Sequence, residues 1–398
     1  MKNSTDDLFS DAVRQLLTAQ CTPQVVRNIE AGQSAQPLWQ LIEASGFADA
    51  LVDEAQGGAG LNLSAVCAVL ELCGSYCLPL PLAETMLARA LLAQAGVDIP
   101  AGSIIFGQAS ENLNTEGNAD ANAPKIALQN ADVISKVSGG LCCDRVHCAQ
   151  VADWVLVTKG EAHGAVEGVT HGAAPGAVSL LLPVSQAKKS TVGFCLDAKL
   201  EWSQADVTKG LRLPCHYDVK TLQACIYAAQ LAGAMQAVFS RTLQYANDRN
   251  QFGRPIGKFQ AIQHQLSVMA EHAFAARMAA QMGCRSNTFM PDRLCVAVAK
   301  ARTSEAAVEV AALSHSIHGA IGFTQEFDLQ LYTRRLHLWR QAGGSESYWH
   351  TVVGTALVDQ HQGLALDLIR STTDSPSSPQ PSPSKGRGSE ARGLSALP

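Results

Sequence analysis

A turn between two helix-like segments gathers side chains that suit a phosphate ligand. Arg249 and Gln251 come at the end of one helical segment, and Gln260 opens the next. Phe252 begins the turn between them. A guanidinium and amide donors beside a helix start can hydrogen-bond a diphosphate. The spacing therefore predicts an anion site here, and the alternative is an ordinary polar turn between two helices.

A second candidate is a cluster of thiols and one imidazole. Cys142, Cys143, His147 and Cys148 fall close together in the chain. Thiolates and imidazoles bind zinc, but the pattern C-C-x-x-x-H-C is not a usual chelating spacing. The segment also has the composition of a strand pair. We therefore predict no metal site.

Two further motifs favour a structural interpretation. His315 and His318 share one face of a helix and could bind a common ligand, although hydrogen bonding at the helix end is the preferred interpretation. The glycines from Gly57 to Gly60 are no nucleotide fingerprint, because no strand precedes them. They mark a break, after which Asn62 or Ser64 is expected to cap a helix.

The elements that must position these residues come in the order helices, strands, helices. Residues 1–100 and the alanine-rich 218–370 show helical periodicity, whereas 101–217 contains short aliphatic runs separated by Gly, Asn and Pro. We expect an α+β fold with an N-terminal helical domain, a middle β domain and a C-terminal four-helix bundle. Residues 371–398, rich in Ser, Pro and Gly, are expected to form a disordered tail. The expected strands include SIIFG, DVISKVSG, DWVLVTKG, AVSLLLPVS and TVGFCL.

Composition narrows the classes of partner. The chain has 398 residues, 47% of them hydrophobic, and a net charge of −5, so no basic field argues for nucleic acid or an anionic membrane. The N-terminus lacks the features of a secretory signal, and no run approaches the length of about 20 apolar residues expected of a membrane span. The 12 cysteines are scattered, several on apolar faces. We expect them to be reduced and mostly buried in a cytoplasmic protein.

The stretch around the predicted anion site closely resembles the acyl-CoA dehydrogenase family, at the start of that family's C-terminal bundle. The resemblance implies FAD as cofactor. It implies that Arg249, Gln251 and Gln260 reach across a dimer interface to the FAD pyrophosphate of the neighbouring subunit. It also implies that Phe252 packs near the cofactor.

A second string, from His318 to Arg335, resembles the family's glycine turn, which approaches the FAD. The resemblance implies contacts from Ser316, Gly319 and Ala320. Where the family commonly has Gln, this chain has Ser316, which costs a side-chain hydrogen bond. Where the family commonly has a second Gly, this chain has Ala320, whose methyl group crowds the backbone slightly. Looser matches extend the resemblance over residues 5 to about 360.

The catalytic base of the family is missing from both of its usual positions. The family's glutamate takes the α-proton of an acyl-CoA thioester while a β-hydride passes to the flavin. The resemblance places that glutamate at Gly343, or alternatively at Gln223, and glutamine cannot accept a proton near neutral pH. Glu346 is the nearest carboxylate. Its favoured interpretation is a solvent-facing residue at a helix start, with a relocated base as the alternative. The stretch from Ser110 to Ala127 matches nothing of the family's flavin-facing strand.

Three functions therefore stay open. The chain is a homo-oligomeric FAD-dependent acyl-CoA dehydrogenase with a relocated base, or a base-less partner that completes the FAD site of a catalytic sister subunit. Some relatives acting on bulky acyl-CoAs, such as steroid side chains or ring acids, are assembled in this second way, which is slightly preferred. The third function is a flavin-dependent oxygenase or a non-redox scaffold. The family further implies an electron-transfer flavoprotein as electron acceptor and a role in fatty acid or steroid catabolism.

Overall fold

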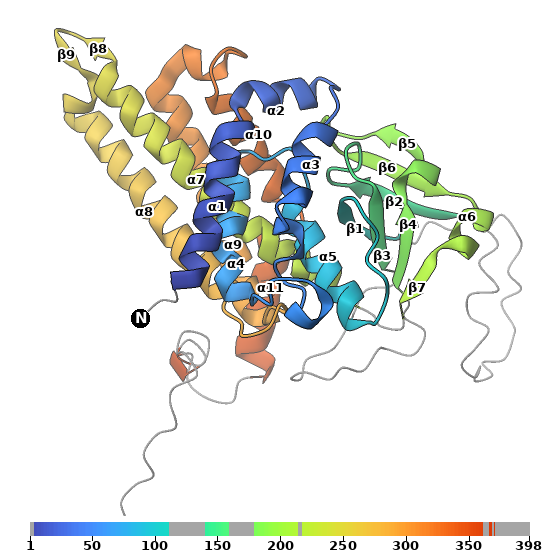
Figure 1. Ribbon diagram of the computed structural model, residues 1–398. Helices are drawn as coiled ribbons and strands as arrows, with labels where there is room; N and C mark the ends of the chain where they lie inside the picture. Colours follow the sequence, from blue (N-terminus) through green and yellow to red (C-terminus); the bar gives the residue numbers. More distant parts are fainter. Residues whose placement is uncertain are drawn as a thin grey trace, which may run out of the picture.

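The computed structural model describes residues 4–110, 140–158, 179–213 and 217–360, together with 366, 367 and 370. The α+β fold class and the order of helices, strands and helices are confirmed. Figure 1 shows the strands between residues 104 and 213 gathered on one side of the molecule and the long C-terminal helices toward the other, with the N-terminal helices between them in this view. The expected tail and the expected strand at 132–139 lie outside the described residues.

The N-terminal helices surround an apolar core that continues into the C-terminal helices. Asn62 caps the fourth helix, because its side chain accepts a hydrogen bond of 2.9 Å from the backbone N–H of Ala65. This confirms one of the two expected capping residues. The helices are α1 (Ser4–Gln20), α2 (Pro23–Glu30), α3 (Gln36–Ala44), α4 (Leu63–Ser75) and α5 (Leu82–Gln94), with short 3-10 turns η1 (Phe47–Asp49) and η2 (Glu54–Gln56).

The middle part is built from two sheets with a second apolar core between them. One sheet has the order β1-β3-β4-β7 and the other the order β2-β6-β5. The predicted strand TVGFCL is wrong beyond Thr191, because Gly193 takes a φ of 69° and the chain turns there. The elements are β1 (Ile104–Gln108), β2 (Leu141–Val146), β3 (Trp154–Thr158), β4 (Ser179–Pro183), η3 (Val184–Gln186), β5 (Lys188–Thr191), β6 (Ala198–Trp202), α6 (Gln204–Lys209) and β7 (Leu211–Leu213).

The C-terminal part is helical. The long helices α7, α8 and α9 pack on one another, and α10 and α11 pack against α7 and α9. The elements are α7 (Val219–Asp248), β8 (Asn250–Gln251), β9 (Arg254–Pro255), η4 (Ile256–Lys258), α8 (Gln260–Gly283), α9 (Arg293–His318), η5 (Gly319–Phe323), α10 (Leu329–Trp339), α11 (Glu346–Thr355) and the π-helical η6 (Ala356–Gln360).

The expectation that no apolar run approaches the length of a membrane span is wrong for helix α7. Within the described part of the chain, this helix alone has the length and apolarity of a membrane span, with a mean hydropathy of 1.2 over its 18-residue window. However, 78% of that window is buried inside the protein. The apolar surface is therefore explained by the position of α7 at the centre of the helical core.

Helices α4 and α7 cross in direct backbone contact. Gly74 of α4 lies against the carbonyl of Gln230, and Gly233 of α7 lies against the carbonyl of Glu71. A Cβ atom at either glycine would overlap that carbonyl, so only glycine permits this approach. The crossing fixes the N-terminal helices relative to α7, which carries much of the candidate site.

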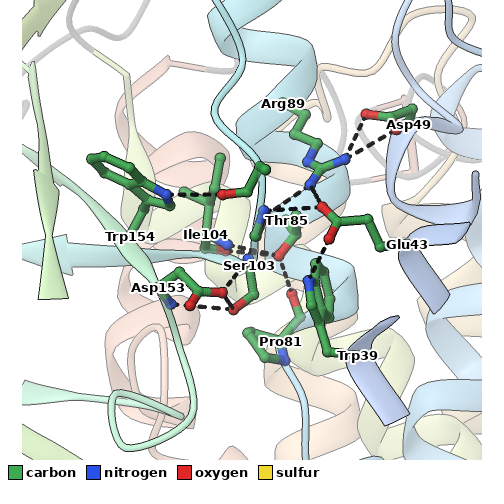
Figure 2. Close-up of polar contacts among 12 residues, drawn as sticks. Trp39, Glu43, Asp49, Pro81, Thr85, Arg89, Ser103, Ile104, Asp153 and Trp154 are labelled. Carbon is green, nitrogen blue, oxygen red and sulfur yellow. Dashed lines mark hydrogen bonds and ion pairs between the residues drawn. The ribbon is translucent and has the colours of Figure 1, made fainter. Parts of the chain in front are cut away.

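A buried guanidinium joins the N-terminal helices to the sheet (Figure 2). Arg89 of α5, 4% exposed, donates to both oxygens of Asp49 at 3.0 Å and to Glu43 at 2.5 Å. It also donates to the carbonyl of Gly102 at 2.9 Å, just before β1. Because every partner comes from a different element, this one side chain positions α3, α5 and the first strand together.

Candidate functional site

The predicted anion site forms a short hairpin that projects from the end of the helical body. Helix α7 ends where Arg249 leaves the helical conformation, and Gln251 then pairs with Arg254 in a two-stranded ribbon. The turn is made by Phe252 at φ 52° and Gly253 at φ 78°. Two successive positive φ values suit a tight hairpin, but the first is uncommon for a bulky residue. Figure 1 shows the β8–β9 hairpin at the end of the molecule far from the sheets.

The hairpin presents open hydrogen-bond donors. Arg249, Gln251 and Gln260 are exposed, and their side chains have no hydrogen-bond or ion-pair partner among the residues that the structure describes. Phe252 is 91% exposed. A free guanidinium, free amides and a helix start are groups that bind a diphosphate, so they fit the pyrophosphate of FAD. Their exposure leaves them accessible to a ligand or to another chain.

The glycine turn lies beside this hairpin. Helix α9 ends at His318, Gly319 follows with φ 65°, and Ala320 is exposed. The His318 ring stacks on Tyr245 of α7 with ring centroids 4.3 Å apart. Ser316, which stands where the family has glutamine, accepts a hydrogen bond of 3.3 Å from Gln265. The structure therefore brings the two segments that resemble the family, the hairpin and the glycine turn, together at one end of the helical body.

The histidines of this turn have local partners. Nδ1 of His318 lies 2.8 Å from the carbonyl of Ser314, and Nε2 of His315 lies 3.0 Å from the hydroxyl of Thr333. Burial lowers the pKa of both histidines, so both are neutral near pH 7. These contacts agree with the interpretation that the two histidines form hydrogen bonds at the helix end and do not share a ligand.

The two expected positions of the base meet in space. Gly343 lies in the loop between α10 and α11, directly against the backbone of α7 at Gln223 and Ala224. It has a φ of 66°, and a Cβ atom there would come within 2.8 Å of the Ala224 nitrogen. Such a contact is tighter than packed atoms tolerate. No side chain fits at Gly343 in this conformation, whatever its chemistry.

Glu346 is held in an ion pair. It is the first residue of α11, which Ser345 caps, and its carboxylate pairs with Arg340. Partial burial raises the pKa of Glu346, but its own backbone N–H and the Arg340 guanidinium outweigh this effect and lower the pKa overall. Glu346 therefore lies at a helix start, as expected. Its side chain was expected to face solvent, but it forms an ion pair with Arg340.

A buried polar cluster that the sequence did not reveal lies one turn further along α7. Tyr227 donates to Glu84 of α5 at 3.0 Å, and the other oxygen of Glu84 accepts from the Phe106 N–H at 2.9 Å. The His147 ring contacts Tyr227 edge to face at 5.5 Å, and its Nδ1 lies 2.9 Å from Asp197. Burial raises the pKa of Glu84. The cluster joins α5, α7 and the β domain in direct contact.

One signal in the sequence pointed to this cluster. Glu84 and Arg89 are the charged residues of the mainly apolar segment from Leu82 to Leu92. A charge inside an apolar helix has to be paired or neutralised. The sequence could not identify the other members of the cluster, because they are distant along the chain. His147 lies more than 60 residues after Glu84, and Tyr227 lies more than 140 residues after it.

The zinc alternative has no support in the structure. No group of three or more His, Cys, Asp or Glu side chains within the described ranges is placed to bind a metal ion. His147 faces Asp197 instead of the neighbouring thiols. All described cysteines are free, and most are buried.

Comparison with known proteins gives a family. Residues 3–98 match the family model for the acyl-CoA dehydrogenase N-terminal domain, and residues 223–357 match the model for the acyl-CoA dehydrogenase C-terminal domain. The acyl-CoA dehydrogenase IpdE2 of Mycolicibacterium smegmatis is 27% identical over 336 residues, which cover 83% of this chain and 92% of that protein.

Solved structures share the fold. The ChsE4-ChsE5 complex from Mycobacterium tuberculosis aligns with a TM-score of 0.67 and 19% identity, covering 91% of this chain and 99% of that one. The Tcur3481-Tcur3483 steroid acyl-CoA dehydrogenase, as its G363A variant, aligns with a TM-score of 0.67 and 21% identity, covering 89% and 98%. At this identity, the likeness establishes the architecture alone.

Proposed function

The chain belongs to the acyl-CoA dehydrogenase family, and from that premise we propose that it is a base-less partner subunit of a heteromeric acyl-CoA dehydrogenase. In this role its hairpin completes the FAD site of a catalytic sister subunit. FAD, when bound, supplies the acceptor for the hydride taken from the acyl-CoA. The sister supplies the glutamate that takes the α-proton.

The conformation of Gly343 carries this proposal. A base at this position would require a side chain, and the contact with Ala224 excludes even a Cβ atom. Gln223, the other position, is an amide without basic character. Glu346 is the remaining alternative, and its pKa is lowered while its carboxylate is paired with Arg340. A group with a lowered pKa is a poor acceptor for a carbon-bound proton.

The hairpin supports the other half of the proposal. Arg249 and Gln251 are exposed and unpaired within the described ranges, beside an exposed Phe252 with positive φ. A strained, exposed aromatic residue and free donors cost stability in an isolated chain, and such features are found at binding sites. These features support a role of the hairpin toward a neighbouring subunit.

Relatives support a heteromer and suggest a class of substrate. The ChsE4-ChsE5 structure is named as a complex, and the Tcur3481-Tcur3483 structure carries a double name and is named as a steroid acyl-CoA dehydrogenase. By analogy, we propose a bulky acyl-CoA, such as a steroid side chain or ring acid, as the substrate of the assembly. A homo-oligomeric dehydrogenase that uses Glu346 is the second candidate, favoured only by the closeness of this carboxylate to Gly343.

Bound flavin tests the proposal. The full chain is purified alone and after co-expression with a candidate catalytic acyl-CoA dehydrogenase subunit from the same organism, and the flavin absorbance per chain is measured. We expect a colourless chain alone and FAD in the complex. A chain that carries FAD alone and reduces it with an acyl-CoA would contradict the proposal. FAD bound alone without reduction would instead favour an oxygenase or another flavoprotein.

The variant Arg249→Met tests the hairpin itself. Loss of a charged hydrogen-bond donor should weaken FAD binding by the complex about tenfold or more, because such bonds contribute roughly 1.5–3 kcal/mol. Arg254→Met is the matched control, since this guanidinium on the same hairpin lies over the Phe259 ring at 4.3 Å. An equal effect of both variants would mean that general charge, and not the Arg249 position, holds the cofactor.

A further inference from the structure

Helix α8 presents to solvent a face that carries almost no charge. Only Glu271 and Arg277 are charged among the 24 residues of this helix, and Arg277 is paired with Glu71 of α4 at 3.1 Å. Figure 1 shows α8 along the outer edge of the helical part, away from the β domain, with the hairpin at its start. The outer face of a surface helix is normally rich in charged side chains, whereas charge is depleted where proteins pack on one another.

The exposed residues of this face follow one regular spacing. Successive members are separated alternately by four and three residues, which is the period of helices that pack along their length. The buried residues of α8, from Leu266 to Ala280, lie on the opposite side of the helix. The exposed set, called the α8 stripe below, consists of Gln260, His264, Ser267, Glu271, Phe274 and Met278.

The end of the α8 stripe far from the hairpin is apolar. Phe274 is 52% exposed, and Met278, one helical turn later, is 67% exposed. The Phe274 ring contacts Phe239 of α7 edge to face, with ring centroids 6.2 Å apart. Aromatic residues and methionine are enriched at protein interfaces, and covering these two side chains would remove apolar surface from water. This end of the stripe therefore favours association with another surface.

The other end of the α8 stripe joins the hairpin. Gln260 is the first residue of α8 and one of the donors proposed to serve the FAD of the sister subunit. Phe274 follows fourteen residues later, about 21 Å further along the helix axis. The hairpin donors and the apolar end thus lie along one edge of the molecule. A chain that takes up the donors is placed to cover the stripe as well.

Glu271 distinguishes a second copy of this chain from a different chain. Eleven residues of α8 precede it and twelve follow, so it lies at the middle of the helix. Its carboxylate has no ion-pair or hydrogen-bond partner among the residues that the structure describes. When two copies pack antiparallel around a two-fold axis along this stripe, the middles of the two helices meet. The two Glu271 carboxylates would then face each other, and facing like charges oppose association.

We propose that the α8 stripe is the docking surface for the corresponding helix of a different, family-related subunit, and that the Glu271 carboxylate keeps two copies of this chain apart. The inference rests on the proposed function, because the sister subunit is the chain that takes up the hairpin donors. The fitting partner helix runs antiparallel to α8 and covers Phe274 and Met278 with apolar side chains. Opposite Glu271 it has a cationic or neutral side chain.

Self-association of the full chain tests the role of Glu271 without any sister subunit. Sedimentation velocity measures the dissociation constant. Glu271→Leu replaces the facing carboxylates by apolar groups, so we expect self-association at least tenfold tighter than in the natural chain. Adding Phe274→Glu to this variant should abolish the gain, because it returns a charge to the same stripe. Asp98→Leu, at an exposed carboxylate after α5, is the matched control and should leave self-association unchanged.

Binding to a sister subunit tests the occupant of the stripe. The partner is a candidate catalytic acyl-CoA dehydrogenase subunit from the same organism, and isothermal titration calorimetry gives its affinity. Phe274→Glu and Met278→Glu should each weaken this binding at least tenfold, since each buries a charge in the interface. Leu8→Glu is the matched control, because Leu8 of α1 is an apolar residue that is 69% exposed outside the stripe. This variant should bind as the natural chain does.

Several outcomes would overturn the proposal. One is a Glu271→Leu variant that associates no more tightly than the natural chain. Another is a natural chain that already forms a dimer which Phe274→Glu dissociates, because a second copy then covers the stripe. The third is sister binding that survives both glutamate variants. Neither measurement reads flavin, so a complex that forms through the stripe but carries no FAD would contradict the proposed function and support this surface.

Discussion

The sealed position at Gly343 can be tested by adding a single carbon. Gly343→Ala places a Cβ atom 2.8 Å from the nitrogen of Ala224 and 3.1 Å from the carbonyl carbon of Gln223. Overpacking of this kind costs about 1–3 kcal/mol, and the left-handed backbone at φ 66° adds about 1–2 kcal/mol for a residue with a Cβ atom. Helix α7 cannot easily recede, since Gly233 already packs it against α4.

The expected loss of stability is therefore about 2–5 kcal/mol. Urea unfolding of the full chain measures it, with tryptophan fluorescence as a local report because Trp349 donates to the Gly343 carbonyl. Gly354→Ala in α11 is the matched control: a Cβ atom there meets nothing within 4 Å, so this variant should be neutral or slightly stabilising. Equal unfolding midpoints for Gly343→Ala and the natural chain would refute the packing argument.

Gly343→Glu extends the test to chemistry. It restores the residue type that the family uses, but it brings the same Cβ atom into the same contact. We expect the stability loss of the alanine variant and no acyl-CoA dehydrogenase activity in the chain alone. A gain of activity would show that the loop opens readily and that the chain has a usable site of its own.

Two further predictions concern the scaffold. Arg89→Met should lower the free energy of unfolding by about 3 kcal/mol, because it leaves the carboxylates of Glu43 and Asp49 without their buried partner; a urea midpoint within the error of the natural chain would contradict this. Gly233→Ala should destabilise by about 1–3 kcal/mol, because the new methyl group overlaps the carbonyl of Glu71 where the helices cross. Since Ala for Gly in a helix is normally stabilising, a raised melting temperature in calorimetry would show that α4 and α7 are farther apart than described.

Local features of the fold could be predicted because their causes are local. The end of α7 at Asp248, the turn at Phe252 and the start of α8 at Gln260 follow from turn and helix-start residues within a dozen positions. The cap at Asn62 likewise depends on an amide three residues away. The strand expected beyond Thr191 is wrong because its aliphatic run contains Gly193, which takes a positive φ and turns the chain.

The site itself could be predicted only in part. The family resemblance places the expected base at Gly343 or Gln223, but nothing in the sequence showed that these two residues touch. The role of Glu84 could not be predicted, because its partner Tyr227 lies on another helix. The burial of Lys300 could not be predicted either, because a lysine in an alanine-rich helix is normally exposed and its burial depends on the loop that folds over it.

The sequence by itself determined the order of elements, the family resemblance and the donors of the hairpin, since each of these rests on residue type and near spacing. Only the tertiary structure decided that Gly343, where the base is expected, has no room for a side chain. That closure depends on the contact of Gly343 with Ala224 and on the hydrogen bonds from the buried Lys300 to the carbonyls of Arg340 and Gly344, across separations of about 120 and 40 residues. Contacts at such separations are fixed by how helices pack, and side-chain periodicity along one helix carries no information about its partner.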